Sequence, residues 1–301
     1  YSSKSKATEC FYDLKADSGN FDSAAFQEGV VTLAEYEGDR KDTEISARLQ
    51  LDYRLSDETL LYTSWNRGVK GGGYNAPTFP LGGVYDDASM SFDPEQLDAY
   101  EVGFKHEFMD GKARLNGAAY YYDYNDYQTF YIVGIDTLTF NSDAESQGFE
   151  LELQASPAEG WDILLGAAYN DIDVDLPDGR TTRPVQSPEW NMNAMVRYEW
   201  EIAQGGRVAL QADSMYRSEH VFAMTGAETV EEDGYTISNV SLTYSAPGDQ
   251  WQVSAFVENV TDEEYLVQTF DLSGTDVFGI TEQYYGRPQW WGVSFKYNWG
   301  N

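Results

Sequence analysis

Metal-binding and nucleophilic side chains are scarce in this sequence. It has two histidines, His106 and His220, and one cysteine, Cys10, among its 301 residues. The histidines lie far apart and outside any H-x-x-x-H spacing, so a zinc centre or a histidine-based catalytic site lacks ligands. A lone cysteine cannot form a disulfide within the chain. No motif brings a general acid, a general base and a nucleophile together, and the sequence predicts a protein that is not an enzyme and has no cofactor.

One stretch, NDIDVDLPDG, has the spacing of a calcium-binding loop. Asp171, Asp173 and Asp175 stand at the first, third and fifth positions of that motif. The sixth position, where the motif requires glycine, is Leu176, and the twelfth, where it requires a bidentate glutamate, is Thr182. The pattern therefore favours a solvated acidic loop over a cation site.

Arginine and tyrosine offer a second chemistry, the binding of a ligand. A guanidinium forms paired hydrogen bonds to an anion, and a tyrosine presents a flat apolar ring with a polar tip. Several such residues lie where predicted strands meet long loops, and we expect them to line a binding site. The candidates are Arg67, Tyr74, Tyr124, Tyr127, Arg217, His220, Gln268, Tyr284 and Arg287.

An alternation of apolar and polar residues identifies the β-strands that hold these candidate residues in place. In the last segment, polar residues separate five aromatic or apolar ones: Trp291, Val293, Phe295, Tyr297 and Trp299. Side chains on a strand point alternately to opposite faces, so this pattern predicts a strand with one apolar face. The pattern predicts about eleven strands, which begin near residues 43, 58, 95, 112, 146, 160, 188, 206, 234, 250 and 287.

The connections between these strands alternate between short and long. The short ones contain the Gly, Asp and Pro residues that tight turns need, as in Asp110-Gly111 and Pro247-Gly248-Asp249. The long polar ones cover residues 71–94, 126–145, 172–187, 218–233 and 262–286. This order predicts an antiparallel meander with every short turn at one end and every long loop at the other.

Charge and aromatic content narrow the fold class further. The net charge is -32 and the sequence pI is about 4.1, which excludes phosphate binding by a basic surface and hence a nucleic-acid partner. Aromatic residues nevertheless make up 15% of the chain. A soluble all-β domain would bury the apolar faces between sheets, whereas a transmembrane β-barrel would turn them to lipid. Charged polar faces and aromatic residues at strand ends favour the transmembrane antiparallel barrel, with the acidic excess in its loops and lumen.

Four segments resemble TonB-dependent outer-membrane receptors. They are TLLYTSWNRGVKGGGYNAP (59–77), LDAYEVGFKHEFMDGKARLNGAAYYYDYNDYQ (97–128), SQGFELELQASPAEGWDILLGAAY (146–169) and VENVTDEEY (257–265). The aromatic ending is also similar to an outer-membrane assembly signal. The resemblance implies short periplasmic turns, long extracellular loops and a location in the outer membrane of a Gram-negative bacterium.

The resemblance also implies a larger protein. Barrels of this family have about 22 strands around a plug domain, so residues 43–301 would be the C-terminal half of the barrel. Residues 1–42 would be an extracellular loop region leading into it, and the plug would not be in this sequence. The implied function is active uptake of a scarce nutrient, most often a ferric siderophore, by a monomeric barrel. The implied partners are TonB, acting through the plug, and outer-membrane lipids including lipopolysaccharide.

A complete small barrel remains the alternative. Residues 26–37 could supply a twelfth strand, and such barrels act as passive pores or lipid hydrolases. Neither histidine lies in a local motif of the hydrolase kind.

Overall fold

The computed structural model describes residues 2–6, 38–75, 90–133, 136–176, 179–273 and 278–299. Regular structure in these residues is almost entirely β-strand. No helix among them is long and apolar enough to span a membrane. Cys10 and the possible extra strand at 26–37 lie outside the described residues.

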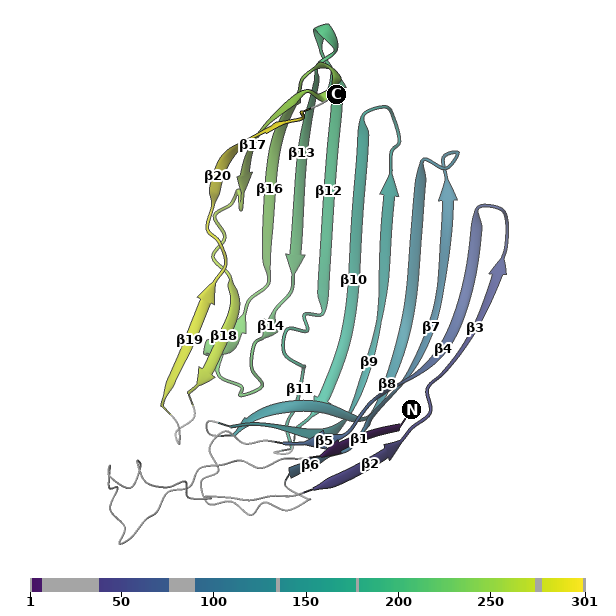
Figure 1. Cartoon of the computed structure of the whole chain (residues 1–301), viewed down its shortest axis with the longest axis vertical. Helices are drawn as coiled ribbons and strands as arrows, with labels where there is room; N and C mark the ends of the chain where they lie inside the picture. The colour runs from purple at the N-terminus through teal and green to yellow at the C-terminus, as the bar shows by residue number, and fades with distance from the viewer. Residues whose placement is uncertain are drawn as a thin grey trace.

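One large antiparallel sheet dominates the structure (Figure 1). Each strand pairs with the main strands that precede and follow it along the chain, as expected for a meander. The strands are β3 (Ala47–Arg54), β4 (Thr59–Lys70), β7 (Glu95–Phe108), β8 (Ala113–Val133), β9 (Asp136–Ala155), β10 (Trp161–Asp175), β12 (Trp190–Glu201), β13 (Arg207–Arg217), β16 (Tyr235–Ser245), β17 (Trp251–Glu258) and β20 (Trp290–Tyr297). These eleven strands confirm the predicted number, and β3 and β20 are the free edges of an open, curved sheet.

Additional short strands lie at the long-loop end of the sheet. Four pairs form small separate sheets, and one short strand extends the main sheet beside β10. The pairs are β1 (Ser2–Lys6) with β2 (Asp39–Thr43), β5 (Gly73–Tyr74) with β6 (Ser91–Phe92), β14 (His220–Val221) with β15 (Glu231–Glu232), and β18 (Leu266–Leu272) with β19 (Ile280–Tyr285). The added strand is β11 (Thr181–Thr182). The 3-10 turns are η2 (Ala203–Gly205), η3 (Glu228–Val230) and η4 (Pro247–Asp249).

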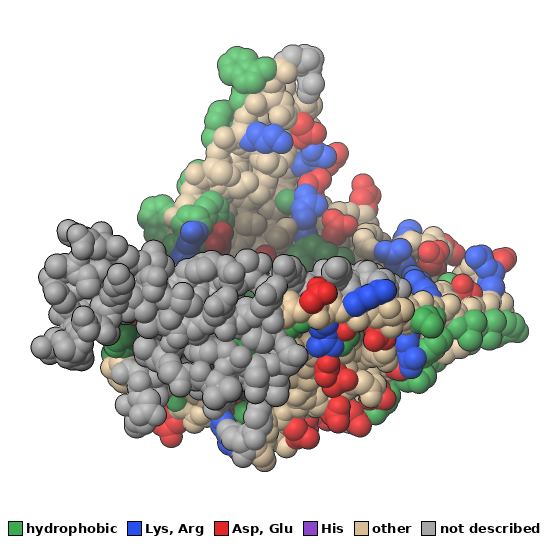
Figure 2. All heavy atoms as spheres, turned by 60° about the horizontal axis from the view of Figure 1, so that its bottom comes forward, with side chains coloured by type: hydrophobic (Ala, Val, Ile, Leu, Met, Phe, Trp, Pro, Cys, Tyr) green, Lys and Arg blue, Asp and Glu red, His purple; other side chains and the backbone are tan. Residues whose placement is uncertain are grey.

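Strand register places the apolar residues on one continuous face. Val257, for example, pairs with Val240 on one side and with Trp291 on the other. Leu151 is 43% exposed and Val293 is 66% exposed, although both are apolar. Figure 2 shows apolar side chains gathered along a rim of the curved sheet, beside charged ones. The predicted division into an apolar and a polar face is therefore present across the sheet, and the apolar face has no protein partner among the described residues.

A row of aromatic residues limits the apolar face at the long-loop end. Trp65, Tyr100 and Tyr121 are register partners on β4, β7 and β8, and the Tyr100 and Tyr121 ring centroids lie 6.5 Å apart. The next row towards the loops contains Arg67 and Asp98. This change from apolar to aromatic to charged side chains is typical of a membrane interface.

The hairpin of β8 and β9 is longer than the sequence indicated. Residues 126–145, predicted as a loop, continue the two strands beyond a bulge between Tyr124 and Tyr127. Asp126 adopts a left-handed φ of 56° there, as one residue does in one common type of bulge. The extended strands then bend across the long-loop end of the sheet (Figure 1). Thr129 contacts Met224 of the loop between β14 and β15, with Oγ1 to Sδ at 3.9 Å.

Most of the buried core lies at this long-loop end. Side chains of the loops and strand extensions pack together there, whereas the spanning strands expose both faces. The buried apolar residues at this end include Met90, Ala144, Ile172, Val174, Leu176, Met224, Val230, Ile237 and Leu266. Buried Asn75 links β5 to the long hairpin, because it donates to the Thr139 carbonyl (2.8 Å) and accepts from the Thr139 amide (2.7 Å).

Candidate functional site

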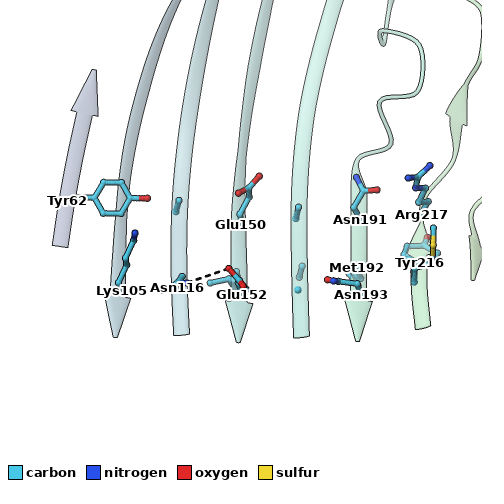
Figure 3. A pocket seen from close by; sticks show the side chains of 16 residues that line it. Tyr62, Lys105, Asn116, Glu150, Glu152, Asn191, Met192, Asn193, Tyr216 and Arg217 are labelled. Carbon is cyan, nitrogen blue, oxygen red and sulfur yellow. Dashed lines mark hydrogen bonds between the residues drawn. The ribbon is translucent and has the colours of Figure 1, made fainter. Parts of the chain in front are cut away.

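A hollow of about 540 Å³, lined by both polar and apolar residues, lies on the concave face of the sheet (Figure 3). Tyr62, Glu150, Asn191 and Arg217 line it from β4, β9, β12 and β13, and Lys105 lies one row nearer the short turns. These residues alternate with the apolar ones along each strand, so the same pattern that makes one face apolar makes this face polar. The hollow can hydrogen-bond a ligand or another protein segment, and it holds charges of both signs.

Aromatic rings lie flat against the concave face of the sheet because glycines stand opposite them on the neighbouring strands. Tyr62 lies over Gly103 of β7, where an added Cβ would come within 2.5 Å of its ring and hydroxyl group. Tyr120 lies over Gly148 of β9 in the same way. Its hydroxyl group donates to Oδ1 of Asn170 at 3.0 Å. The glycines thus let large side chains cover the neighbouring strand and leave the concave side open.

Tyr120, Tyr122 and Tyr124 form a column on β8 that rises towards the long loops. The rings of Tyr120 and Tyr122 stack with centroids 4.6 Å apart, and Tyr124 meets Tyr127 edge-to-face at 5.2 Å. Burial and the nearby charge of Glu95 raise the pKa of Tyr127, which lies beyond the aromatic row at the membrane interface. These tyrosines offer ring faces and hydroxyl groups to the concave side.

Carboxylates stand beside the tyrosine column on the same face. Glu101 on β7 is the register partner of Tyr120, and Glu150 on β9 lines the hollow together with Tyr62. No salt bridge between described residues reaches either carboxylate. We name this surface the tyrosine–carboxylate wall and define it as Tyr62, Tyr120, Tyr122, Tyr124, Glu101 and Glu150.

Arg67, predicted to bind a ligand, lies on the apolar face with Trp65 rather than on the concave one. Its guanidinium donates from Nε to Asp98 Oδ1 at 2.9 Å and from Nη2 to Asp98 Oδ2. Trp65 Nε1 donates to the same Asp98 carboxylate at 2.9 Å. Asp98 is only 6% exposed. Arg67 and Trp65 therefore supply the hydrogen bonds that its nearly buried carboxylate needs at the membrane interface.

The other predicted arginines lie near the long loops. Arg217 ends β13, where it is the register partner of Tyr235, and it lines the concave hollow. Arg287 lies over the ring of Trp290, with its guanidinium carbon 4.6 Å from the centroid. Neither is paired with a carboxylate in a salt bridge among the described residues.

The remaining predicted residues are spread over three hairpins. Tyr74 lies in β5, Gln268 in β18 and Tyr284 in β19, where the Tyr284 hydroxyl group donates to Glu282 at 2.7 Å. His220 is buried, and its Nδ1 lies 3.0 Å from the carbonyl oxygen of Ser218. The structure brings Tyr124 and Tyr127 together, and Gln268 and Tyr284 are register partners. It does not gather the nine predicted residues into one site.

Asp171, Asp173 and Asp175 belong to β10 and not to a loop. Ile172 and Val174, which separate them, are buried, so the stretch has the alternation of a strand. The three carboxylates line a shallow hollow of about 300 Å³. Among the described residues, no group of three or more His, Cys, Asp or Glu side chains is placed to hold a metal ion.

Comparison with known proteins matches most of the chain to one family. The family model described as "TonB dependent receptor-like, beta-barrel" matches residues 12–260. The ferric-pyoverdine BN7/BN8 receptor of Pseudomonas putida is 25% identical over 252 residues, which are 82% of this chain and 27% of that protein. The pesticin receptor of Yersinia enterocolitica is 26% identical over 232 residues, which are 76% of this chain and 33% of that protein. The chain thus spans about a quarter to a third of these relatives.

A solved structure has the same fold. The ferric yersiniabactin uptake receptor FyuA from Yersinia pestis superimposes with a TM-score of 0.70 at 21% identity, covering 86% of this chain and 38% of that one. The apolar convex face, the aromatic row and the alternation of short turns and long loops agree with this likeness. The chain belongs to the TonB-dependent receptor-like β-barrel family and forms part of the wall of a Gram-negative outer-membrane barrel.

Proposed function

We propose that this chain is part of a receptor that imports a ferric siderophore across the outer membrane, with energy supplied through TonB. The observation that carries the proposal is the family match over residues 12–260, together with relatives named as ferric-siderophore receptors. The concave wall supports it, because a wet, polar inner face suits the passage of a polar chelate. This wall supplies no set of groups for catalysis, which favours transport.

The arrangement of the whole receptor is part of the proposal. Residues 43–301 form the C-terminal half of a barrel of about 22 strands, and residues 1–42 belong to an extracellular loop region. A plug domain outside this sequence contacts TonB, and lipids including lipopolysaccharide surround a monomeric barrel. The edge strands β3 and β20, which have one neighbour each among the described residues, support this proposal, because an unpaired strand edge needs a partner in a membrane.

Iron uptake by the full-length receptor tests the proposed function. The receptor is produced in a Gram-negative strain without siderophore receptors, and uptake of radiolabelled iron is measured for a panel of ferric siderophores. We expect uptake of at least one of them, and we expect its loss when TonB is deleted. Uptake that persists without TonB would indicate a passive pore and contradict the proposal.

A further inference from the structure

We propose that one exposed face of the β18–β19 hairpin is an interface within the whole receptor. Its partner is the loop-end continuation of the barrel strand that pairs with β20, which belongs to the part of the receptor outside this sequence. This inference rests on the proposed arrangement of a larger barrel. It adds a protein contact in the aqueous phase, beyond the strand pairing that closes the barrel in the membrane.

The hairpin lies outside the membrane-spanning part of the sheet. It connects β17 to β20, and Figure 1 shows it beyond the loop end of β20. The segment that leads into β18 carries Asp262, Glu263 and Glu264, and Arg287 lies between β19 and β20. Because charged side chains are costly in the hydrocarbon core, the hairpin stands in water, where lipid does not cover it.

One face of the hairpin already packs on a neighbouring loop. Asp271 of β18 is 3% exposed and accepts a hydrogen bond from Thr225 at 2.6 Å. On β19, Oγ1 of Thr281 lies 3.2 Å from Oγ1 of Thr229, and Gln283 donates to the Thr229 carbonyl at 2.9 Å. Thr225 and Thr229 belong to the loop between β14 and β15, so this polar face has its partner.

The opposite face, which we name the hairpin face, is largely uncovered by the described residues. Side chains of successive register pairs alternate between the two faces of a hairpin. Phe270, Ile280 and Tyr284 of this face are 48%, 49% and 48% exposed. Apolar groups gathered on a surface in water indicate a contact site. The register pairs of the hairpin face are Gln268–Tyr284, Phe270–Glu282 and Leu272–Ile280.

The edge position of β20 indicates what covers the hairpin face. β20 has one neighbour among the described residues, β17, and an unpaired strand edge in a membrane needs a partner strand. The chain spans about a quarter to a third of its relatives, so most of the proposed receptor lies outside this sequence. A strand that pairs with β20 and continues past its loop end runs beside the hairpin. The hairpin of β8 and β9 shows such a continuation in this sheet.

The imported chelate suits the hairpin face less well than a protein segment does. Gln268 and Tyr284, two of the residues predicted to bind a ligand, lie on this face. An anionic chelate there would meet apolar Phe270 and Ile280 and no cation of either strand, because β18 and β19 contain no Lys or Arg. We therefore assign Gln268 and Tyr284 to packing within the receptor.

Photo-crosslinking in the full-length receptor identifies the partner. The photoreactive residue p-benzoylphenylalanine replaces Phe270 or Ile280, intact cells are irradiated, and the captured peptide is identified by mass spectrometry. We expect both positions to capture the barrel strand next to β20, or the loop that continues it, outside residues 1–301. Leu242 on β16 is the matched control, because it is apolar and 49% exposed but faces lipid, and it should capture no protein. Capture of a second receptor copy, of residues 1–301 or of no protein from the hairpin face would overturn the inference.

Thiol labelling measures how well the hairpin face is covered. Ile280→Cys and the control Phe278→Cys are each made in a Cys10→Ser background, so that a single thiol reacts with a maleimide. Phe278 precedes β19 and is 68% exposed. In the folded receptor we expect Ile280→Cys to react roughly tenfold more slowly than Phe278→Cys, and in the heat-denatured receptor at the same rate.

Two labelling results would overturn the inference. Equal rates in the folded receptor would show that the hairpin face is open. Slow labelling of Ile280→Cys only after a ferric siderophore is added would assign the face to the cargo.

Failure of the inference differs from failure of the proposed arrangement. Hydrogen exchange of the full-length receptor reports on the β20 amides that do not bond to β17. Protection of these amides without crosslinking from the hairpin face would overturn the inference alone. Rapid exchange of these amides would show that no strand pairs with β20, and the proposed larger barrel would fall together with the inference.

Discussion

Tyr120 lies across Gly148, its register partner on β9, and its hydroxyl group bonds to Asn170 on β10 beyond. An added Cβ on Gly148 would come within 2.5 Å of that hydroxyl group and would also meet the carbonyl oxygen of Tyr169. Three strands are therefore joined by one ring that only glycine can accommodate. The same glycine keeps the tyrosine–carboxylate wall flat.

Replacing this glycine should displace the ring. We expect Gly148→Ala to lower the free energy of unfolding of the full-length receptor by about 1–3 kcal/mol, as overpacking does. Gly68→Ala on β4 is the control, because an added Cβ there meets nothing within 4 Å. Thermal unfolding in detergent measures both. Equal effects of the two substitutions would show that Tyr120 does not need this space.

The bend of the long hairpin should depend on pH through Asp126. Burial and the charges of Asp93 and Asp143 raise the pKa of Asp126. The folded hairpin thus favours the protonated form, and this contribution to stability is present at acidic pH and lost as pH rises through the raised pKa. Asp126→Asn removes the charge and tolerates the left-handed backbone.

Hydrogen exchange measures this effect. We expect Asp126→Asn to increase the protection of the Gln128 and Thr129 amides at pH 7, and to match the wild-type receptor at a pH below the ordinary value for aspartate. Higher protection at acidic pH as well, or none at pH 7, would show that the charge of Asp126 does not weaken the bend.

Asp271 should have the opposite pH dependence. Burial alone would raise the pKa of Asp271, but hydrogen bonds from Thr225, Ser273 and Thr281 hold it below its usual value. Its contribution to stability is present above the ordinary aspartate pKa and lost as pH falls through the lowered one. These bonds tie the loop after β14 to the hairpin of β18 and β19.

Limited proteolysis at neutral pH tests this tie. We expect Asp271→Asn to speed cleavage within residues 218–234, because the amide offers a weaker acceptor to three donors. The control Asp233→Asn removes the same charge at an exposed position and should leave the cleavage rate near that of the wild type. Cleavage at wild-type rates in Asp271→Asn would mean that other contacts hold the loop.

Arg67 should matter for stability and not for cargo binding. Arg67→Gln leaves nearly buried Asp98 without its cation, which we expect to cost about 1–3 kcal/mol. Arg183→Gln, whose partner Glu189 is more exposed, should cost less. Siderophore affinity of the assembled receptor should be unchanged in both. A large loss of affinity in Arg67→Gln would restore this residue to the binding site.

The strands could be predicted because the membrane imposes one physical pattern on each of them. Lipid requires apolar side chains at alternate positions of a strand. The sequence therefore shows directly that Leu151 faces the lipid and the adjacent Glu150 faces the lumen. β9, however, begins at Asp136, ten residues before its predicted start at 146. Beyond the membrane, loops pack on both faces of the hairpin, and the alternation that marks a half-apolar strand disappears.

The candidate site was less predictable, although some signals were present. Arg67 shares its face with Trp65 and Thr63, so strand parity already placed it on the apolar side. Ile172 and Val174 indicated a strand where the aspartates suggested a loop. The role of Gly148 opposite Tyr120 needs the register between two strands, which the sequence of either strand alone does not contain.

The assignment of the two faces is tested most directly by comparing Leu151→Arg with Glu150→Leu in the full-length receptor. The measurement is the fraction of receptor assembled in the outer membrane as a heat-modifiable barrel. We predict that Leu151→Arg reduces assembly, because an arginine facing mid-bilayer costs about 2–4 kcal/mol. Glu150→Leu should assemble like the wild type. Normal assembly of Leu151→Arg together with loss of assembly in Glu150→Leu would show that the polar face, and not the apolar one, faces the lipid.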